Sequence, residues 1–309
     1  MTQSIQTKQL FFLFFSIMTI LIFFAPLRML FIQAFNDEVY DYIVLVPLVS
    51  LYFLYIQRKE LFATTAYSIP AGITIMLFGV VFYLIGMQHV SGSNQIGSLS
   101  LVTLSIVIFW IGGFVLFHGI HVMRKALFPL LFLFFIVPLP AFLLEKIISF
   151  LQEGSAEVAY VLFQLSGVPV FREGFIFHLP KISIEVAKQC SGIHSGIALL
   201  ITSVIAAKLF LATGWRKGVL ILTVVPITIF KNGLRIVTLS LLGNNIDERI
   251  LSSPLHRKGG IPFFILALIV LFTVLWLLRR SEQNMGTTGS SPSAGLGGRH
   301  SASSITSET

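Results

Sequence analysis

Three residue types that can together carry out acyl transfer occur in the C-terminal part of the chain. The only cysteine, Cys190, stands in AKQCSGIHSGIALL, where a polar segment gives way to an apolar run. Arg235 lies inside the apolar run ITIFKNGLRIVTL, and His256 lies in the polar stretch SSPLHRKGG before the next apolar run. A thiolate can attack a peptide carbonyl, an imidazole can protonate the leaving amine, and a guanidinium can stabilise the oxyanion.

Residues that follow Cys190 are candidates for binding a substrate beside the thiol. Ser191 can cap the helix that is expected to follow, and Gly192 allows another part of the backbone to approach closely. His194 stands four residues after the cysteine, a spacing that permits direct contact on a helix. Ordinary residues at a helix start are an equally good explanation of Ser191 and Gly192.

Two cations within one apolar run also need an explanation, because a charge inside a membrane is costly. Lys231 and Arg235 are four residues apart and therefore share one helix face, with Asn232 between them. We expect Arg235 to face the protein interior. Lys231 and Asn232 are candidates for substrate binding, although Lys231 can equally extend to the membrane surface or bind a lipid phosphate.

Composition identifies an integral membrane protein. Of the 309 residues, 55% are hydrophobic and 11% are charged, so the apolar surface exceeds what a soluble core can bury. The net charge of +8 comes from basic residues at the ends of apolar runs, which indicates membrane topology and not a nucleic-acid partner. About eight runs are long enough to be spans: 10–32, 40–56, 69–88, 98–118, 126–144, 192–213, 218–242 and 261–278. The first run is too long for a signal peptide and is expected to be a retained helix.

The loop charges predict the orientation of these spans. Placing both termini in the cytoplasm puts every strongly basic short loop on the cytoplasmic side. The residues concerned are Lys8, Arg58, Lys59, Arg124, Lys125, Arg216, Lys217, Arg279 and Arg280. Cys190 then lies at the outer face of the cell (inner) membrane, facing the periplasm or the exterior. We expect residues 1–280 to form the integral membrane catalytic domain and residues 281–309, rich in Gly, Ser and Thr, to be a disordered cytoplasmic tail.

The segment between the fifth and sixth runs is expected to form a small element on the outer face. Residues 145–189 are amphipathic at first and then alternate as short strands do, which predicts an interfacial helix followed by a small hairpin. The alternation in FIFHLPKISIEV suggests that residues 169–186 bind an extended substrate by strand addition.

We expect no metal and no cofactor. His118 and His121 fall on the predicted cytoplasmic side and His178 on the outer side, so these histidines cannot share a metal site. The chain has no P-loop, dinucleotide fingerprint or zinc-protease motif. A single cysteine also excludes a disulfide within the chain.

The motifs AKQCSGIHS and NGLRI, followed by His256, resemble the Cys, Arg and His signature of the exosortase and archaeosortase family. The resemblance extends over about residues 40–278 and includes VPLPAFLLEKI and GVPVFREGFIFHLP. It implies a polytopic membrane cysteine transpeptidase that recognises a C-terminal signal on exported proteins. That signal consists of a short motif such as Pro-Glu-Pro, a transmembrane helix and a basic tail.

Carried over to this chain, the resemblance implies that Cys190 is the nucleophile and that Arg235 stabilises the oxyanion or orients the substrate. His256 would be the general acid and base, in preference to His194, which is then a substrate-side or interfacial residue. The partners implied are membrane-anchored exported proteins, the lipid bilayer and an acceptor, either an amine or a lipid. Hydrolysis and transfer are both open.

Two other function classes remain as alternatives. In the first, the protein is a transporter or a flippase of lipid-linked glycans, Lys231 and Arg235 bind an anionic headgroup, and Cys190 has no role. No internal repeat of the kind common in transporters is evident, which favours the enzyme. The second, an intramembrane serine protease, lacks a GxSxG-like segment.

Overall fold

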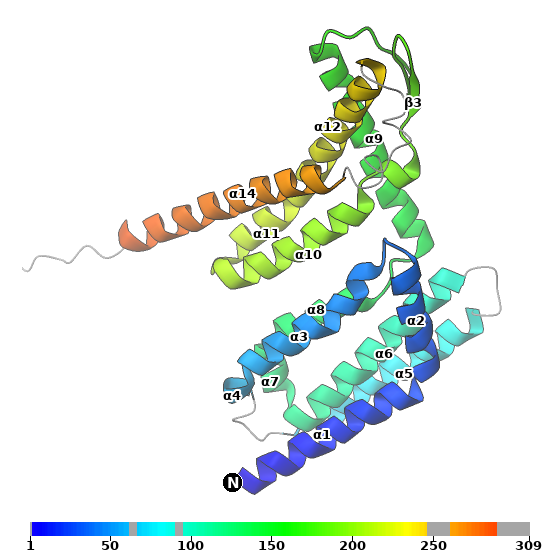
Figure 1. Ribbon diagram of the computed structural model, residues 1–309. Coiled ribbons are helices and arrows are strands. Elements are labelled where there is room, and N and C mark those ends of the chain that lie inside the picture. Colours follow the sequence, from blue (N-terminus) through cyan, green and yellow to red (C-terminus); the bar gives the residue numbers. More distant parts are fainter. Residues whose placement is uncertain (1, 62–66, 90–94, 246–259, 289–309) are drawn as a thin grey trace, which may run out of the picture.

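The computed structural model describes residues 2–61, 67–89, 95–245 and 260–288, and nearly all of them are helical (Figure 1). The helices up to residue 136 are α1 (Thr2–Ile22), α2 (Phe24–Asn36), η1 (Asp41–Val44), α3 (Leu45–Ile56), α4 (Arg58–Leu61), α5 (Ile69–His89), α6 (Gln95–His118), α7 (Ile120–Lys125), α8 (Leu127–Phe132) and η2 (Leu133–Ile136). Those that follow are α9 (Ala141–Leu165), η3 (Lys188–Cys190), α10 (Ile193–Phe210), α11 (Gly214–Leu222), α12 (Val224–Asn245) and α14 (Gly260–Thr288). The predicted all-α membrane architecture is confirmed.

The predicted count of eight spans is not confirmed by the described part of the chain. Within the described part of the chain, five helical segments are long and apolar enough to cross a membrane, or seven if each of two bent helix pairs counts as one span. The five are Ile69–Gln88, Gly97–His118, Ile193–Phe210, Gly214–Asn245 and Gly260–Asn284. The predicted span 40–56 corresponds to a shorter apolar helix, Asp41–Ile56.

Prolines coincide with both bends. α1 and α2 meet at 74°, and Pro26 stands in the first turn of α2. α8 and η2 meet α9 at 90°, and the connection between them contains Pro138 and Pro140. Proline donates no backbone hydrogen bond and disfavours helical geometry in the residue before it. The predicted spans 10–32 and 126–144 each cross one of these breaks.

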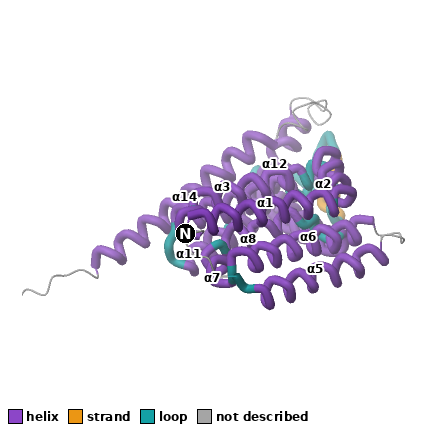
Figure 2. Tube along the Cα trace, turned by 90° about the horizontal axis from the view of Figure 1, so that it is seen from below, coloured by secondary structure: helices purple, strands orange, loops and turns teal. Residues whose placement is uncertain are grey.

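Three short strands precede α10, one more than the predicted hairpin. They are β1 (Phe171–Glu173), β2 (Ile176–His178) and β3 (Ser183–Glu185). They form an antiparallel sheet in the order β1-β2-β3. Figure 1 shows the sheet beside α9 and α12, which pack against each other. In Figure 2 the strands lie at the end of the molecule opposite α7 and α11.

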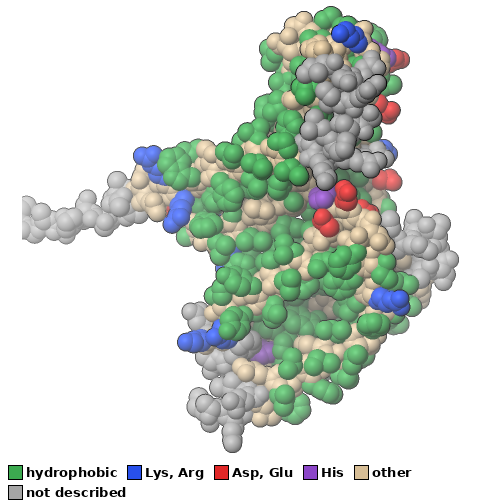
Figure 3. Space-filling view, in the orientation of Figure 1, with side chains coloured by type: hydrophobic (Ala, Val, Ile, Leu, Met, Phe, Trp, Pro, Cys, Tyr) green, Lys and Arg blue, Asp and Glu red, His purple; other side chains and the backbone are tan. Residues whose placement is uncertain are grey.

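Three groups of buried side chains hold the elements around Cys190. The first joins the start of α10, through Ile193, to the η1 region, through Tyr40 and Ile43. The second joins α10, α11, α12 and α14, and the third joins the sheet to α9 and α12. Hydrophobic side chains are also spread over the face of the molecule shown in Figure 3, as expected for contact with lipid.

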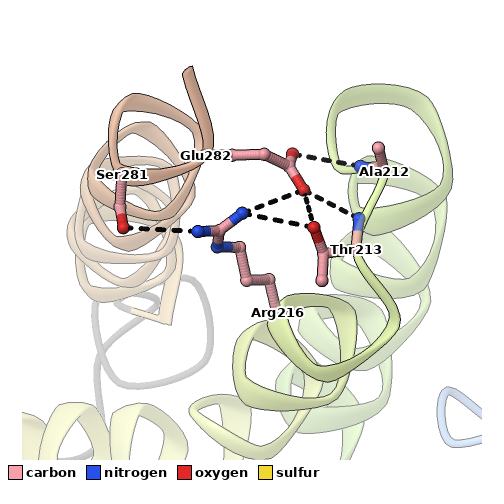
Figure 4. Close-up of polar contacts among 5 residues, drawn as sticks. All are labelled: Ala212, Thr213, Arg216, Ser281 and Glu282. Atoms are coloured by element: carbon pink, nitrogen blue, oxygen red, sulfur yellow. Dashed lines mark hydrogen bonds and ion pairs between the residues drawn. The ribbon is translucent and has the colours of Figure 1, made fainter. Parts of the chain in front are cut away.

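A polar cluster fixes α14 to the turn between α10 and α11 (Figure 4). The Glu282 carboxylate accepts hydrogen bonds from the backbone N–H groups of Ala212 and Thr213, at 3.1 and 2.8 Å, and from the Thr213 hydroxyl. The buried Arg216 guanidinium lies 3.1 Å from the same carboxylate and also contacts Ser281 at 3.5 Å. α14 continues beyond this cluster, so the part of the expected disordered tail from residue 281 to Thr288 is helical. Residues 289–309 lie outside the described part.

Candidate active site

Cys190 lies in a short turn before α10. Its own N–H donates to the carbonyl of Ala187 at 2.8 Å, and the N–H of Ser191 donates to the carbonyl of Lys188 at 3.1 Å. The turn forms the single 3₁₀ turn η3, and α10 begins three residues after the cysteine, at Ile193. The Cys190 side chain is half-buried.

Of the two explanations left open for Ser191, capping does not apply, because Gly192 occupies the N-cap position of α10 and no side chain caps this helix. Gly192 has φ +82°, a left-handed conformation that residues with a Cβ rarely adopt. A Cβ at this position would also lie 3.2 Å from Cγ of Asn232. The Ser191 hydroxyl is fully buried and has no hydrogen-bond partner among the described residues. Glycine is therefore needed at position 192, both for the left-handed turn and for the close approach of α12.

Two consecutive residues of α12 hold this turn. Asn232 is fully buried, and its Nδ2 donates to the carbonyl oxygen of Cys190 at 2.6 Å. The Lys231 ammonium donates to the hydroxyl of Ser195, which in turn donates to the carbonyl oxygen of Gly192 at 3.0 Å. The backbone on both sides of Ser191 is thus fixed to one helix, and the position of the thiol follows from it.

The structure brings Cys190 and Arg235 together at one cavity. The cavity has a volume of about 290 Å³ and is lined by Ser183, Ile184, Glu185, Val186, Cys190, Asn232, Arg235, Ile236, Leu239 and Ser240. The residues from α12 recur at three- and four-residue intervals, so they form one face of that helix. The opposite wall is β3 and the residue after it. A thiol, a guanidinium and an exposed strand therefore border the same space.

The segment from Lys181 to Cys190 runs antiparallel to α12 along this cavity. At one end the N–H of Lys181 donates to Oδ1 of Asn244 at 3.0 Å, and at the other Asn232 holds Cys190. The helix rises about 18 Å between these two asparagines, at about 1.5 Å per residue. Midway along the segment, Nε2 of Gln152 donates to the carbonyl oxygen of Val186 at 2.6 Å.

The sequence model of the transmembrane exosortase family (Exosortase_EpsH) matches residues 33–273, which include Cys190, Arg235 and His256. The chain belongs to this family. Membership implies a membrane transpeptidase role for this exosortase. No curated protein and no solved structure is similar enough to the chain to count as a match.

The remaining candidate site residues, Lys231, His194 and His256, either do not line this cavity or lie outside the described residues. Lys231 is 5% exposed and does not line the cavity that Arg235 lines, so these two cations do not share a binding space there. His194 faces two acidic residues, with Nε2 3.3 Å from Oδ2 of Asp41 and Nδ1 3.9 Å from Oε2 of Glu38. His256 falls in 246–259, outside the described residues.

Sequence reasoning missed three polar residues that position the site, namely Gln152, Ser195 and Asn244. Each is a polar side chain within a helix of a largely apolar chain, and this pattern is a signal that a hydrogen bond is needed. It does not reveal the partner. Among the described residues, no group of three or more His, Cys, Asp or Glu side chains is arranged to hold a metal ion.

Proposed function

We propose that this exosortase is a cysteine transpeptidase or protease that cleaves C-terminal sorting signals of exported proteins at the outer face of the membrane. The observation that carries the proposal is the shared cavity of Cys190 and Arg235 at the sheet end of the molecule. A nucleophile and a cation next to one space are what attack on a carbonyl and stabilisation of the resulting oxyanion require.

The proposed reaction proceeds through a thioester. The Cys190 sulfur attacks the carbonyl carbon of the scissile peptide bond, a C–S bond forms, and Arg235 stabilises the negative charge on the oxygen. His256, in a role that rests on the family resemblance, takes the thiol proton during the attack and gives it to the leaving amine when collapse of this intermediate breaks the C–N bond. Water or an acceptor amine or lipid then attacks the thioester and gives its proton to His256, the C–S bond breaks, and the same proton restores the thiol.

The substrates proposed are membrane-anchored exported proteins with a short motif, a transmembrane helix and a basic tail. The helix reaches the enzyme by diffusion within the bilayer, which holds the motif at the level of the outer membrane surface. Binding energy from the helix can therefore position the peptide bond, and the chemistry needs no further cofactor.

Co-expression with a tagged protein that bears such a signal tests the proposal. The wild-type enzyme is expected to shorten the substrate, whereas Cys190→Ala leaves it at full length although the variant is still inserted in the membrane. Mass analysis of the new C-terminus separates hydrolysis from transfer. Equal shortening by both proteins, or no shortening across several candidate motifs, would remove the assigned role of Cys190.

A further inference from the structure

β3 is an edge strand, and its register shows which backbone groups face outward. Among the described residues it pairs only with β2, with Phe177 opposite Ile184 and His178 opposite Ser183. The N–H of Val186 donates to the carbonyl of Phe175, and the same directly opposed pairing recurs between Leu179 and Ile182. Hydrogen-bonded pairs alternate along an antiparallel ladder, so Ile184 bonds to β2 whereas the backbone groups of Ser183 and Glu185 point away from it.

The outward-facing groups of β3 are largely unused. The carbonyl of Glu185 accepts from the N–H of Ala187 at 3.0 Å. The N–H of Glu185 and both backbone groups of Ser183 have no partner among the described residues. Ser183 and Glu185 also line the cavity that contains Cys190. An open strand edge is a template for pairing with another extended chain, and here it opens into the candidate active site.

We propose that the edge of β3 is the docking strand for the substrate, which adds to the sheet as a fourth strand in parallel orientation. The inference rests on the proposed function and extends it to the recognition of the substrate backbone. The occupant is the extended segment of the substrate that immediately precedes the scissile bond.

The direction of pairing follows from the course of the enzyme's own chain. From Lys181, beside Asn244, it runs to Cys190, beside Asn232, and then enters the apolar helix α10. A substrate that passes from its exported domain through its motif into its membrane helix runs the same way. In a parallel pair, one substrate residue opposite Ile184 donates its N–H to the carbonyl of Ser183 and accepts from the N–H of Glu185.

This arrangement separates affinity from sequence recognition. The hydrogen bonds to Ser183 and Glu185 are made by the substrate backbone and are therefore available to any extended peptide that contains no proline at the paired position. Side chains of the added strand alternate between the two faces of the sheet. Substrate residues on one side of the added strand then lie toward α12 and Arg235, where the motif can be read.

Photocrosslinking tests docking without relying on catalysis. In the Cys190→Ala protein, the photocrosslinker p-benzoylphenylalanine is placed at Ser183, on the proposed docking edge. In a second protein it is placed at Phe171, which is 67% exposed in β1, the strand at the opposite edge of the sheet. The probe is a co-expressed tagged protein with a C-terminal motif, helix and basic tail. Crosslinks are expected from position 183 and not from position 171. Equal capture at both positions, or capture only at 171, would overturn the proposal.

Backbone substitution in the otherwise wild-type enzyme tests the hydrogen bond itself. Glu185→Pro and Glu185→Ala both remove the carboxylate, but only proline removes the N–H. That N–H is not bonded to β2, so we expect the sheet to be retained. The proline variant is expected to process the substrate at least about fivefold more slowly than the alanine variant, in line with one lost hydrogen bond. A proline scan of the substrate before its cleavage site should show losses at alternate positions. Equal rates for the two variants would contradict docking at this edge.

The two experiments distinguish failure of docking from failure of the proposed function. Crosslinking from Ser183 without processing by the wild-type enzyme would retain the docking strand and remove the peptidase role. Processing without a position-183 crosslink would retain the peptidase role and place the substrate elsewhere.

Discussion

At the scale of single residues, Asn232 connects the helix that carries Arg235 to the turn that carries Cys190. Its amide donates to the carbonyl of Cys190, and its side chain fills the space left by the missing Cβ of Gly192. Because Asn232 and Arg235 both belong to α12, the orientation of this helix determines where the thiol lies relative to the guanidinium. Asn232 is best described as a positioning residue, because it bonds to the backbone of the nucleophile.

Replacing Asn232 by alanine should slow processing while leaving the fold largely intact. The carbonyl of Cys190 loses its donor, which we expect to reduce the processing rate about tenfold, equivalent to about 1.4 kcal/mol. Asn244→Ala is the matched control, because it removes a side chain–backbone hydrogen bond from the other end of the same helix, to Lys181. Processing rate and the rate of Cys190 labelling by a maleimide are measured for both. Similar effects of the two substitutions on both rates would show that Asn232 has only a structural role.

The spacing of residues predicted the meeting of Cys190 and Arg235 but not the way in which they are held. Loop charges and span lengths placed both residues at the outer ends of neighbouring helices, and the two residues line one cavity. The hydrogen bonds of Asn232 and Lys231 depend on side-chain rotamers and on the conformation of Gly192, which no residue pattern specifies. For that reason the sequence indicates Asn232 and Lys231 as candidates for substrate binding and not as residues that hold the turn. His256 lies outside the described residues and its role stays a prediction.

At the scale of elements, the hydrophobic runs were easier to find than their breaks. Hydropathy averages over a window, so 10–32 and 126–144 appeared continuous although Pro26, Pro138 and Pro140 were present in the sequence. The second break matters for the site, because it turns α9 away from α8 and lets it pack along α12. Short strands were indicated by alternation, whereas their number depends on the turn at Gly174 and on pairing, which the pattern leaves undetermined.

The contact between α9 and α12 depends on glycine, and Gly233→Ala should disrupt it. A Cβ at Gly233 would lie 2.6 Å from Cγ1 of Val158 and 3.2 Å from the backbone nitrogen of Ala159, so the two helices must separate. We expect a loss of about 1–3 kcal/mol in stability and a lower melting temperature of the detergent-solubilised protein. Gly218→Ala in α11 is the control, because nothing lies within 4 Å of its Cβ. A Gly233→Ala protein as stable as the Gly218→Ala protein would contradict close helix contact.

At the scale of the whole molecule, the two ends differ in charge and in the structural elements that they contain. The sheet and the cavity lie at one end, and the cluster of Arg216 and Glu282 fixes α14 to the α10–α11 turn at the other. In Figure 3, the charged side chains on the left of the view are Lys and Arg, whereas Asp and Glu side chains gather on the right together with some Lys and Arg. Basic residues are retained on the cytoplasmic side of membrane proteins, so this distribution supports an outward-facing cavity.

The proposed orientation predicts opposite labelling of two introduced cysteines. In the Cys190→Ala background the chain has no other thiol, so Phe171→Cys in β1 and Trp215→Cys in α11 can be examined one at a time. Both native side chains are exposed, at 67% and 59%, and they belong to opposite ends of the molecule. A membrane-impermeant maleimide added to intact cells should label the cysteine at position 171, whereas that at position 215 should react only after permeabilisation. The reverse pattern would place the cavity in the cytoplasm, where the motif of an exported protein is no longer accessible, and the proposed sorting function would then fail.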